Sequence, residues 1–436
     1  MDTTAAAPPT VAQASKVWFL IGLNSFGGPA GQIGIMHRML VEERGWIDEK
    51  SFLHALNFCM LLPGPEAMQL ATYIGWRLHA TLGGLIAGVL FVLPGFLAIA
   101  GLSVLYVTLG DLALVEAVFF GLKAAVLAVV LVALQRMASR VLDQPLRWLL
   151  AGLAFVSLFA FNVPFPLVIL AAGLFGLLAT RNHWLTDNSP SAGPAAAIAW
   201  QKTLRTGLLW LALWLVPIAM IWWLFGSNSV FVQQMLFFSK TAMVTFGGAY
   251  AVLAYVAQQA VEAFAWLQPG EMLDGLGMAE ATPGPLIQIL QFVGFMGAWR
   301  AETGLSPITA ALLASVLVTW VTFIPCFLWI FVGAPYMEQL RGNRWLSGAL
   351  SCITAAVAGV MLNLAVWFGL HLLFADLAQR QFGPLRLLIP DPSSLNGLSL
   401  AITLAAWLVL WRSKLGVIPV LAIAASTGAA LTLLIG

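Results

Sequence analysis

The sequence predicts an all-α polytopic membrane protein: two inverted-topology repeats of about six helices, joined by one connecting helix. Three observations predict this class. Charged residues make up 9% of the 436 residues and hydrophobic types 61%, whereas soluble domains carry about 25% charged residues. The apolar runs are continuous and reach the length of about 20 residues that a spanning helix needs. Short motifs recur in the second half at a constant spacing, which indicates an internal duplication.

The composition also excludes several classes of protein. A soluble enzyme of this size could not cover its surface with so few charges. With a formal net charge of +2, the chain lacks the excess of basic residues that is typical of nucleic-acid-binding proteins. The apolar runs do not alternate with polar residues, as the strands of a membrane barrel would. Three cysteines lie in apolar runs without metal-ligand spacing, so we expect neither a disulfide framework nor a metal site: Cys59, Cys326 and Cys352.

The order of segments follows from hydropathy. Residues 1–15 form a polar tail with no basic stretch before the first apolar run, so no cleaved signal peptide is expected. We assign 16–181 to the first repeat, 182–228 to a polar linker with the connecting helix, and 229–436 to the second, inverted repeat. The expected membrane segments are 17–40, 56–78, 82–109, 113–136, 147–162, 164–181, 206–225, 229–260, 276–299, 306–334, 348–373, 395–411 and 415–435. Whether 147–181 crosses twice stays open, because both segments are short.

The duplication is visible as a constant offset in residue number. Two motifs recur at an offset of 220: Phe26-Gly27-Gly28 as Phe246-Gly247-Gly248, and Pro63-Gly64-Pro65 as Pro283-Gly284-Pro285. Further along the offset becomes 231, as between Pro94 and Pro325. The odd connecting helix at 206–225 inverts the second half, as in many secondary transporters, whose binding sites lie at the repeat interface. Parallel halves of a decayed duplication are the alternative.

The two Pro-Gly-Pro motifs interrupt segments of membrane length. Proline lacks the N–H group of a helical residue and clashes with the preceding turn, so it breaks a helix. Broken backbone at membrane depth is tolerated only where protein buries it or where it lines an aqueous cavity. A helix restarting after the break directs its free N–H groups toward that cavity, which suits an anion. Polar residues follow both breaks: Glu66, Gln69, Gln288 and Gln291. The alternative is a proline kink that only shapes packing.

The two Phe-Gly-Gly motifs are the second matched feature. Paired glycines permit a positive φ and close approach of backbone. They could unwind a helix around an ion, or they could be small-residue contacts between helices. Their occurrence in both halves favours a functional role for the motifs and their polar neighbours, which include Ser25, Thr245 and Tyr250.

Lys123 lies in the middle of an apolar run. A lysine at mid-helix costs about 2.5–3.5 kcal/mol on the insertion scale, so it should face a cavity or a partner. We expect it to attract an anionic substrate. The alternative is a structural ion pair with Glu116 or Glu66.

With these motifs the chain resembles the chromate ion transporter superfamily in its long two-domain form. The resemblance rests on FGGPAGQIGIMHRMLVEERGWIDEKSF (26–52), LLPGPEAMQLATYIGW (61–76), GLKAAVLAVV (121–130), TFGGAYAVLAYV (245–256) and ATPGPLIQILQFVGF (281–295). The family's Gly-Lys-Ala-Ala pattern matches at Lys123, whereas the second half has Thr354 at the corresponding place. Ala249 stands where many members carry a third glycine.

The resemblance implies a secondary transporter rather than an enzyme. It would export chromate, a tetrahedral oxyanion, across the bacterial inner membrane as a multi-pass protein and confer chromate resistance, driven by membrane potential or ion coupling. The alternatives are a transporter or exchanger of sulfate or another oxyanion, and a membrane-embedded enzyme acting on a lipid. The expected partners are the lipid bilayer and chromate or a sulfate-like oxyanion, with no nucleic acid and no cofactor; a homodimer stays open.

The candidate substrate-binding residues combine these motifs. They are Ser25, Phe26, Gly27, Gly28, Pro63, Gly64, Pro65, Glu66, Gln69, Lys123, Thr245, Phe246, Gly247, Gly248, Tyr250, Pro283, Gly284, Pro285, Gln288 and Gln291.

Overall fold

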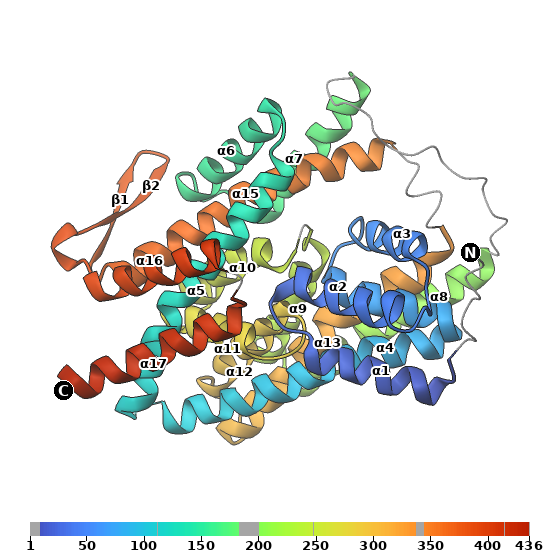
Figure 1. Cartoon of the computed structure of the whole chain (residues 1–436), viewed down its shortest axis with the longest axis horizontal. Helices are drawn as coiled ribbons and strands as arrows, with labels where there is room; N and C mark the ends of the chain where they lie inside the picture. The colour runs from blue at the N-terminus through green and yellow to red at the C-terminus, as the bar shows by residue number, and fades with distance from the viewer. Residues whose placement is uncertain are drawn as a thin grey trace. The chain divides into compact units, whose positions relative to one another are not determined.

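The computed structural model describes residues 9–110, 112–182, 200–246, 248–336, 344–413 and 415–435. This part of the chain is almost entirely helical, as predicted, with one two-stranded hairpin (Figure 1). Its contacts divide it into two compact units, each assembled from three stretches of sequence. Unit 1 comprises 1–101, 188–249 and 282–347, and unit 2 comprises 102–187, 250–281 and 348–436. Both halves of the sequence therefore contribute to each unit.

Unit 1 is built around helix α13. Its elements are α1 (Val11–Asn24), α2 (Gly28–His37), the π-helix η1 (Arg38–Glu42), α3 (Glu49–Cys59), most of α4 (Glu66–Leu109), α8 (Trp200–Phe225), α9 (Val230–Met243), η3 (Leu286–Gln288), α12 (Ile289–Trp299), α13 (Pro307–Gly333) and η4 (Ala334–Tyr336). Helix α13 packs against α8, α9 and α12. The most apolar stretch of α13 is 72% buried, against 17% for that of α8. Helix α13 is therefore the core of this unit, and α8 offers most of its apolar surface to the surroundings.

Unit 2 is built around helix α5. Its elements are the end of α4, α5 (Ala113–Val141), α6 (Pro145–Phe159), α7 (Phe165–Arg181), α10 (Ala249–Gln258), the π-helix η2 (Gln259–Ala263), α11 (Glu271–Ala281), α15 (Arg344–Leu373), β1 (Leu377–Phe382), β2 (Leu385–Pro390), η5 (Pro392–Ser394), α16 (Gly397–Arg412) and α17 (Val417–Ile435). Helix α5 packs against α11, α16 and α17. Gly121 of α5 and Gly428 of α17 lie against backbone atoms of the partner helix, so these two helices approach closely.

Five described helices are long and apolar enough to cross a membrane: α4, α5, α8, α13 with its 3-10 extension, and α15. Six shorter apolar helices accompany them, among them α6 and α7. At 15 and 17 residues, α6 and α7 would extend over about 23–26 Å, less than the bilayer core of about 30 Å. The described chain is therefore a multi-pass membrane protein that combines long helices with helices too short to span the core when upright.

Several expected segments differ in detail from the structure. One helix ends and another begins at the Pro-Gly-Pro and Phe-Gly-Gly motifs. The expected segments 17–40, 229–260 and 276–299 are therefore each divided into separate helices. The expected segment 56–78 is divided between α3 and the first part of α4. The boundary expected between 78 and 82 is present, because α4 consists of two helices joined at a kink, with non-helical dihedral angles at His79 and Ala80. Helix α1 begins at Val11, inside the expected tail, because Thr10 and Gln13 form a capping box. Residues 1–8 and residues 183–199 of the expected linker lie outside the described residues.

The hairpin β1–β2 was not expected, because its residues occupy a connection between two apolar segments. The strands pair in antiparallel register from Leu377 with Pro390 to Phe382 with Leu385. The N–H group of Arg386 donates to the carbonyl of Ala160, at the turn between α6 and α7 (2.8 Å). The contact joins the hairpin to a turn that lies far away in the sequence, which hydropathy cannot reveal.

Candidate functional site

The two Pro-Gly-Pro motifs form two loops in unit 1. The first lies between α3 and α4, and the second lies between α11 and η3. The central glycines, Gly64 and Gly284, have φ values of 123° and 100°. L-residues with a side chain rarely adopt such values, so glycine is required at both positions. The helix that follows each loop starts with N–H groups that have no partner within the helix.

Each loop is hydrogen-bonded to the end of the helix before the other half's Phe-Gly-Gly motif. The N–H group of Gly64 donates to the carbonyl of Thr245 (2.7 Å), and that of Gly284 donates to the carbonyl of Ser25 (2.9 Å). The two donors, like the two acceptors, are related by the offset of 220 seen in the sequence, so the two bonds are equivalent. The structure therefore brings the four motifs together in pairs that cross between the halves.

Ser25 and Thr245 take part through their backbones. Their hydroxyl groups donate to carbonyls one turn earlier in the same helix, Ser25 to Ile21 (2.6 Å) and Thr245 to Thr241 (2.7 Å). Both side chains are fully buried. Ser25 caps the C-terminus of α1, Thr245 lies just after the C-terminus of α9, and each presents a carbonyl group to the opposite loop.

The described Phe-Gly-Gly glycines have positive φ values, which glycine permits. The φ values are 78° for Gly27, 74° for Gly28 and 102° for Gly248, while Gly247 lies outside the described residues. Phe26 and Phe246 are half-buried beside them. Helix α2 begins at Gly28, and helix α10 begins at Ala249, directly after Gly248.

Two buried glutamine side chains donate hydrogen bonds to carbonyl groups of the loops. Gln69 donates to the carbonyl of Pro63 (2.8 Å), and Gln32 donates to that of Gly284 (2.7 Å). Gln288 and Gln291 instead donate to α4 carbonyls, those of Val92 and Phe96 (both 2.9 Å). Gln32 was not among the predicted site residues, because its partner lies in the other half of the chain and no local signal marks it.

Small residues make room for both loops. A Cβ atom on Gly64 would lie 2.9 Å from Sγ of Cys326, and one on Gly284 would lie 3.0 Å from Cα of Gly95. Gly95 and Cys326 are related by the offset of 231, the second offset of the sequence. The two loops thus sit in matched surroundings that no larger residue at their centres would fit.

Glu66 and Gln69 lie in the first turn of α4, directly after the first loop, and Glu66 is half-buried. In the second half the corresponding positions belong to Leu286 and Ile289. A carboxylate is therefore present beside one loop and has no counterpart beside the other.

Lys123 belongs to unit 2 and has a partner that the sequence did not indicate. Its Nζ atom lies 3.2 Å from Oδ2 of Asp274 on α11, and the hydroxyl of Tyr106 donates to the same oxygen (2.9 Å). Glu116 and Glu66 were the expected alternatives. The available signal was the acidic residue within the apolar run 272–280, but only tertiary packing aligns Asp274 with Lys123.

Tyr250 also belongs to unit 2. Its hydroxyl donates to Oε1 of Glu280, in a short contact between α10 and α11. Glu280 is buried. Tyr250 therefore binds a carboxylate, and its hydroxyl group is occupied in this structure.

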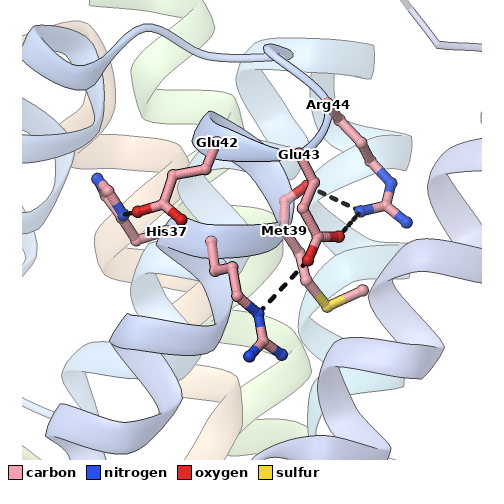
Figure 2. A network of polar contacts seen from close by, with 6 residues as sticks. His37, Met39, Glu42, Glu43 and Arg44 are labelled. Carbon is pink, nitrogen blue, oxygen red and sulfur yellow. Dashed lines mark hydrogen bonds and ion pairs between the residues drawn. The ribbon is translucent and has the colours of Figure 1, made fainter.

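An exposed polar network surrounds the π-helix η1. His37 pairs with Glu42, and Glu43 pairs with Arg44, which also donates to the carbonyl of Met39 (Figure 2). On the other side of Glu43, Arg38 lies at 3.4 Å. Arg38, Glu42 and Glu43 are well exposed, and His37 and Arg44 are half-buried. The network therefore belongs to the loop before α3 rather than to a buried site.

The described residues offer little for other kinds of site. Within them, no group of three or more His, Cys, Asp or Glu side chains could hold a metal ion. A cavity of about 130 Å³ lies between α16 and α17. Its lining is apolar apart from Thr427, so it does not suit a dianion.

Comparison with known proteins gives consistent matches along the chain. A family model described as chromate transporter matches residues 12–177 and 232–430. The chain is 31% identical over 431 residues to the chromate transport protein of Pseudomonas aeruginosa, covering 98% of this chain and 94% of that protein. It is 28% identical over 373 residues to the chromate transport protein of Cupriavidus metallidurans, covering 84% and 86%. It is 24% identical over 354 residues to an uncharacterized transporter of Methanocaldococcus jannaschii, covering 80% and 82%. No solved structure matches the chain.

Proposed function

The chain belongs to the chromate transporter family, and from that premise we propose that it is a secondary transporter that exports chromate across the bacterial inner membrane. Export would lower the concentration of chromate in the cell and so confer resistance. The relatives from Pseudomonas aeruginosa and Cupriavidus metallidurans are both chromate transport proteins by name.

One observation carries the proposal for the site: the pair of equivalent hydrogen bonds from Gly64 to Thr245 and from Gly284 to Ser25. They support a pseudo-twofold arrangement in which the interrupted segments of two inverted repeats meet. Secondary transporters with inverted repeats bind their substrates at such interrupted helices near the membrane midplane. We therefore propose that the two Pro-Gly-Pro loops and the two Phe-Gly-Gly motifs line the substrate pathway.

The chemistry of the loops suits a tetrahedral dianion. Each loop is followed by a helix whose first N–H groups and positive dipole end favour negative charge. Lys123 of unit 2 adds a cation that is partly exposed, with 26% of its side chain accessible. Within unit 1, we propose that the backbone N–H groups after the loops bind the oxyanion. Within unit 2, we propose that Lys123 attracts it.

Membrane potential favours the outward direction. With the cell interior negative, each elementary charge that crosses 100 mV is worth about 2.3 kcal/mol, so a dianion gains roughly twice that on leaving. Export therefore needs no ATP. Uptake of the same anion would require coupled cations.

Transport by the full chain in liposomes tests this function. Vesicles preloaded with chromate should take up radiolabelled chromate by counterflow, and an imposed interior-negative potential should accelerate efflux. Sulfate has the charge and shape of chromate, so competition by sulfate measures the preference between them. Counterflow of sulfate with no movement of chromate would contradict the proposal and support a sulfate transporter. Conversion of a lipid without solute movement would support an enzyme.

A further inference from the structure

The two side chains of the ion pair between Lys123 and Asp274 differ in their exposure, and the two carboxylate oxygens of Asp274 differ in their hydrogen bonding. Asp274 is 3% exposed at its side chain and Lys123 is 26% exposed. One carboxylate oxygen, Oδ2, accepts both the Lys123 contact and the Tyr106 hydrogen bond. The other, Oδ1, is buried and has no hydrogen-bond partner among the described residues. A buried ionised carboxylate normally has both oxygens satisfied, so this charge depends heavily on the single cation.

We propose that Asp274 is the proton-binding residue of transport: its carboxylate competes with the oxyanion for Lys123 and takes up a proton when the oxyanion displaces it. This inference rests on the proposed function. The ammonium group is the accessible end of the pair, so an anion can approach Lys123 while Asp274 lies behind it. A buried carboxylate that loses its cation is strongly disfavoured in the charged form, and protonation removes that charge.

The exchange balances in charge and atoms. Before binding, the Lys123 ammonium and the Asp274 carboxylate form a neutral pair. After binding, the ammonium faces the dianion, and Asp274 is a neutral carboxylic acid that has gained one proton from the solution. Release of the oxyanion on the other side of the membrane returns Lys123 to Asp274 and frees the proton there. One proton thus moves with each dianion, in the same direction.

Few other groups in the described part of the chain act on Asp274. Its charged and polar neighbours are Lys123 of α5, Tyr106 of α4, and Glu271 one turn earlier on its own helix. Helix α17, which also packs against α11, carries no ionisable residue. Under the two sequence offsets, Lys123 corresponds to Thr354 and Asp274 to His54, so this acid–lysine pair has no repeat copy. We therefore expect one coupled proton per transport cycle.

The coupling has two consequences. One net negative charge crosses with each oxyanion rather than two, which halves the electrical driving force for export. Binding of the oxyanion and binding of the proton assist each other by the same factor, because linkage is reciprocal. The affinity for the oxyanion should therefore rise as pH falls, by about 5- to 150-fold between the two plateaus.

Calorimetry on the full chain in lipid nanodiscs tests the proposal. Chromate is titrated in buffers with different ionisation enthalpies, at pH values where chromate stays a dianion, and sulfate serves as a second dianion. The wild-type protein should take up one proton per bound anion at the alkaline end of the transition. Asp274→Asn should take up none, should bind at least as tightly as the wild type, and should lose the pH dependence. Glu271→Gln removes a charge from the same helix without touching Lys123, so it should keep proton uptake.

The outcomes separate the two proposals. If the wild-type protein binds neither anion, the proposed function fails. If it binds chromate without proton uptake, or if Asp274→Asn keeps proton uptake, the role of Asp274 fails while the transporter function stands. The wild-type measurement needs no variant, so a misfolded Asp274→Asn protein does not remove the test. In that case Asp274→Glu, which keeps the acid, should retain both proton uptake and the pH dependence.

Discussion

The segments 28–59 and 249–281 have the same local structure but different surroundings. Each has a ten-residue helix after the glycine motif, a five-residue π-helix, a loop, and an eleven-residue helix that ends before a Pro-Gly-Pro loop. Yet the first segment belongs to unit 1, and nearly all of the second belongs to unit 2. Helix α3 carries exposed charges next to the network of Figure 2, whereas α11 is buried from Met272 to Glu280. The two segments thus share a backbone pattern, while their side chains and tertiary partners differ.

The side of the membrane on which each of the two segments lies depends on whether the repeats are inverted. If the repeats are inverted, Glu43→Cys and Ala263→Cys, at exposed positions that correspond in the two repeats, should face opposite sides. An impermeant maleimide added to intact cells should modify one variant and not the other, and the pattern should reverse in everted vesicles. The native cysteines are buried, so their background should be low. Modification of both variants from one side would refute the inverted arrangement.

The two loop glycines should differ in their tolerance of substitution. Alanine at a positive φ costs about 1–2 kcal/mol, and overpacking adds about 1–3 kcal/mol. At Gly64 the new methyl group meets side-chain atoms of Gln69 and Cys326, whereas at Gly284 it also meets the backbone of Gly95, which cannot move aside as easily. Chromate flux per reconstituted protein should therefore fall in both variants, and further in Gly284→Ala.

A matched control exists for these substitutions. Gly34 lies in α2, and a Cβ atom there would meet nothing within 4 Å. Gly34→Ala should leave flux and thermal unfolding close to those of the wild type. If Gly64→Ala and Gly284→Ala had the same flux and thermal unfolding as this control, glycine would not be required in the loops. The matched geometry of the two loops would then not be evidence for a role in transport.

The third comparison is between Lys123 and its counterpart Thr354. Lys123→Met leaves the buried Asp274 carboxylate without its cation, and breaking a buried pair costs about 3–5 kcal/mol unless the carboxylate is protonated. We expect lower protein abundance and much weaker chromate transport. Lys123→Met with Asp274→Asn should recover abundance but not transport, because the cation that attracts the anion is still missing.

Abundance in membranes and flux in liposomes measure the two effects separately. Thr354 donates a hydrogen bond to the carbonyl of Leu350 in its own helix (2.8 Å), so Thr354→Val should change either quantity little. Full recovery of transport in the double variant would show that Lys123 merely neutralises Asp274.

The smallest effect concerns the starts of α3 and α11. Asp48 caps α3 by accepting from the N–H group of Ser51 (2.9 Å). At α11, Glu271 instead accepts from the N–H group of Gln268 (2.7 Å). Loss of an N-cap side chain costs about 1 kcal/mol. Asp48→Ala should therefore lower the thermal stability slightly and leave chromate flux unchanged.

The Asp48 cap also gives a dependence on pH. Hydrogen bonds from Ser51 hold the pKa of Asp48 below its usual value of 3.8. Its stabilising effect is therefore fully present above that value and is lost as pH falls through the lower pKa of the folded state. The difference in unfolding temperature between wild type and Asp48→Ala should vanish at acidic pH. A difference that persisted there would show that the side chain acts by packing rather than by its charge.

Patterns along the chain were enough to predict the membrane class and to single out the two glycine motifs and the two proline breaks. Hydropathy, proline and paired glycine act over one helical turn or one bilayer thickness, so they can be read locally. The offset of 220 further singled out Gly64 with Gly284 and Ser25 with Thr245 as matched positions. It did not indicate that the members of these pairs would bond crosswise.

The partners of the buried polar side chains, by contrast, follow from tertiary packing. Lys123 meets Asp274, and Gln32 meets Gly284, although the members of each pair come from different halves of the chain. Glu116 and Glu66 were the predicted alternatives for Lys123, because spacing along a helix and the proximity of motifs are the only guides that a sequence offers. Which face of α11 meets α5 depends on how several helices pack at once. That packing is set by small residues such as Gly277 of α11, which lies against Leu122 and Val126 of α5, and by surfaces that no single segment contains.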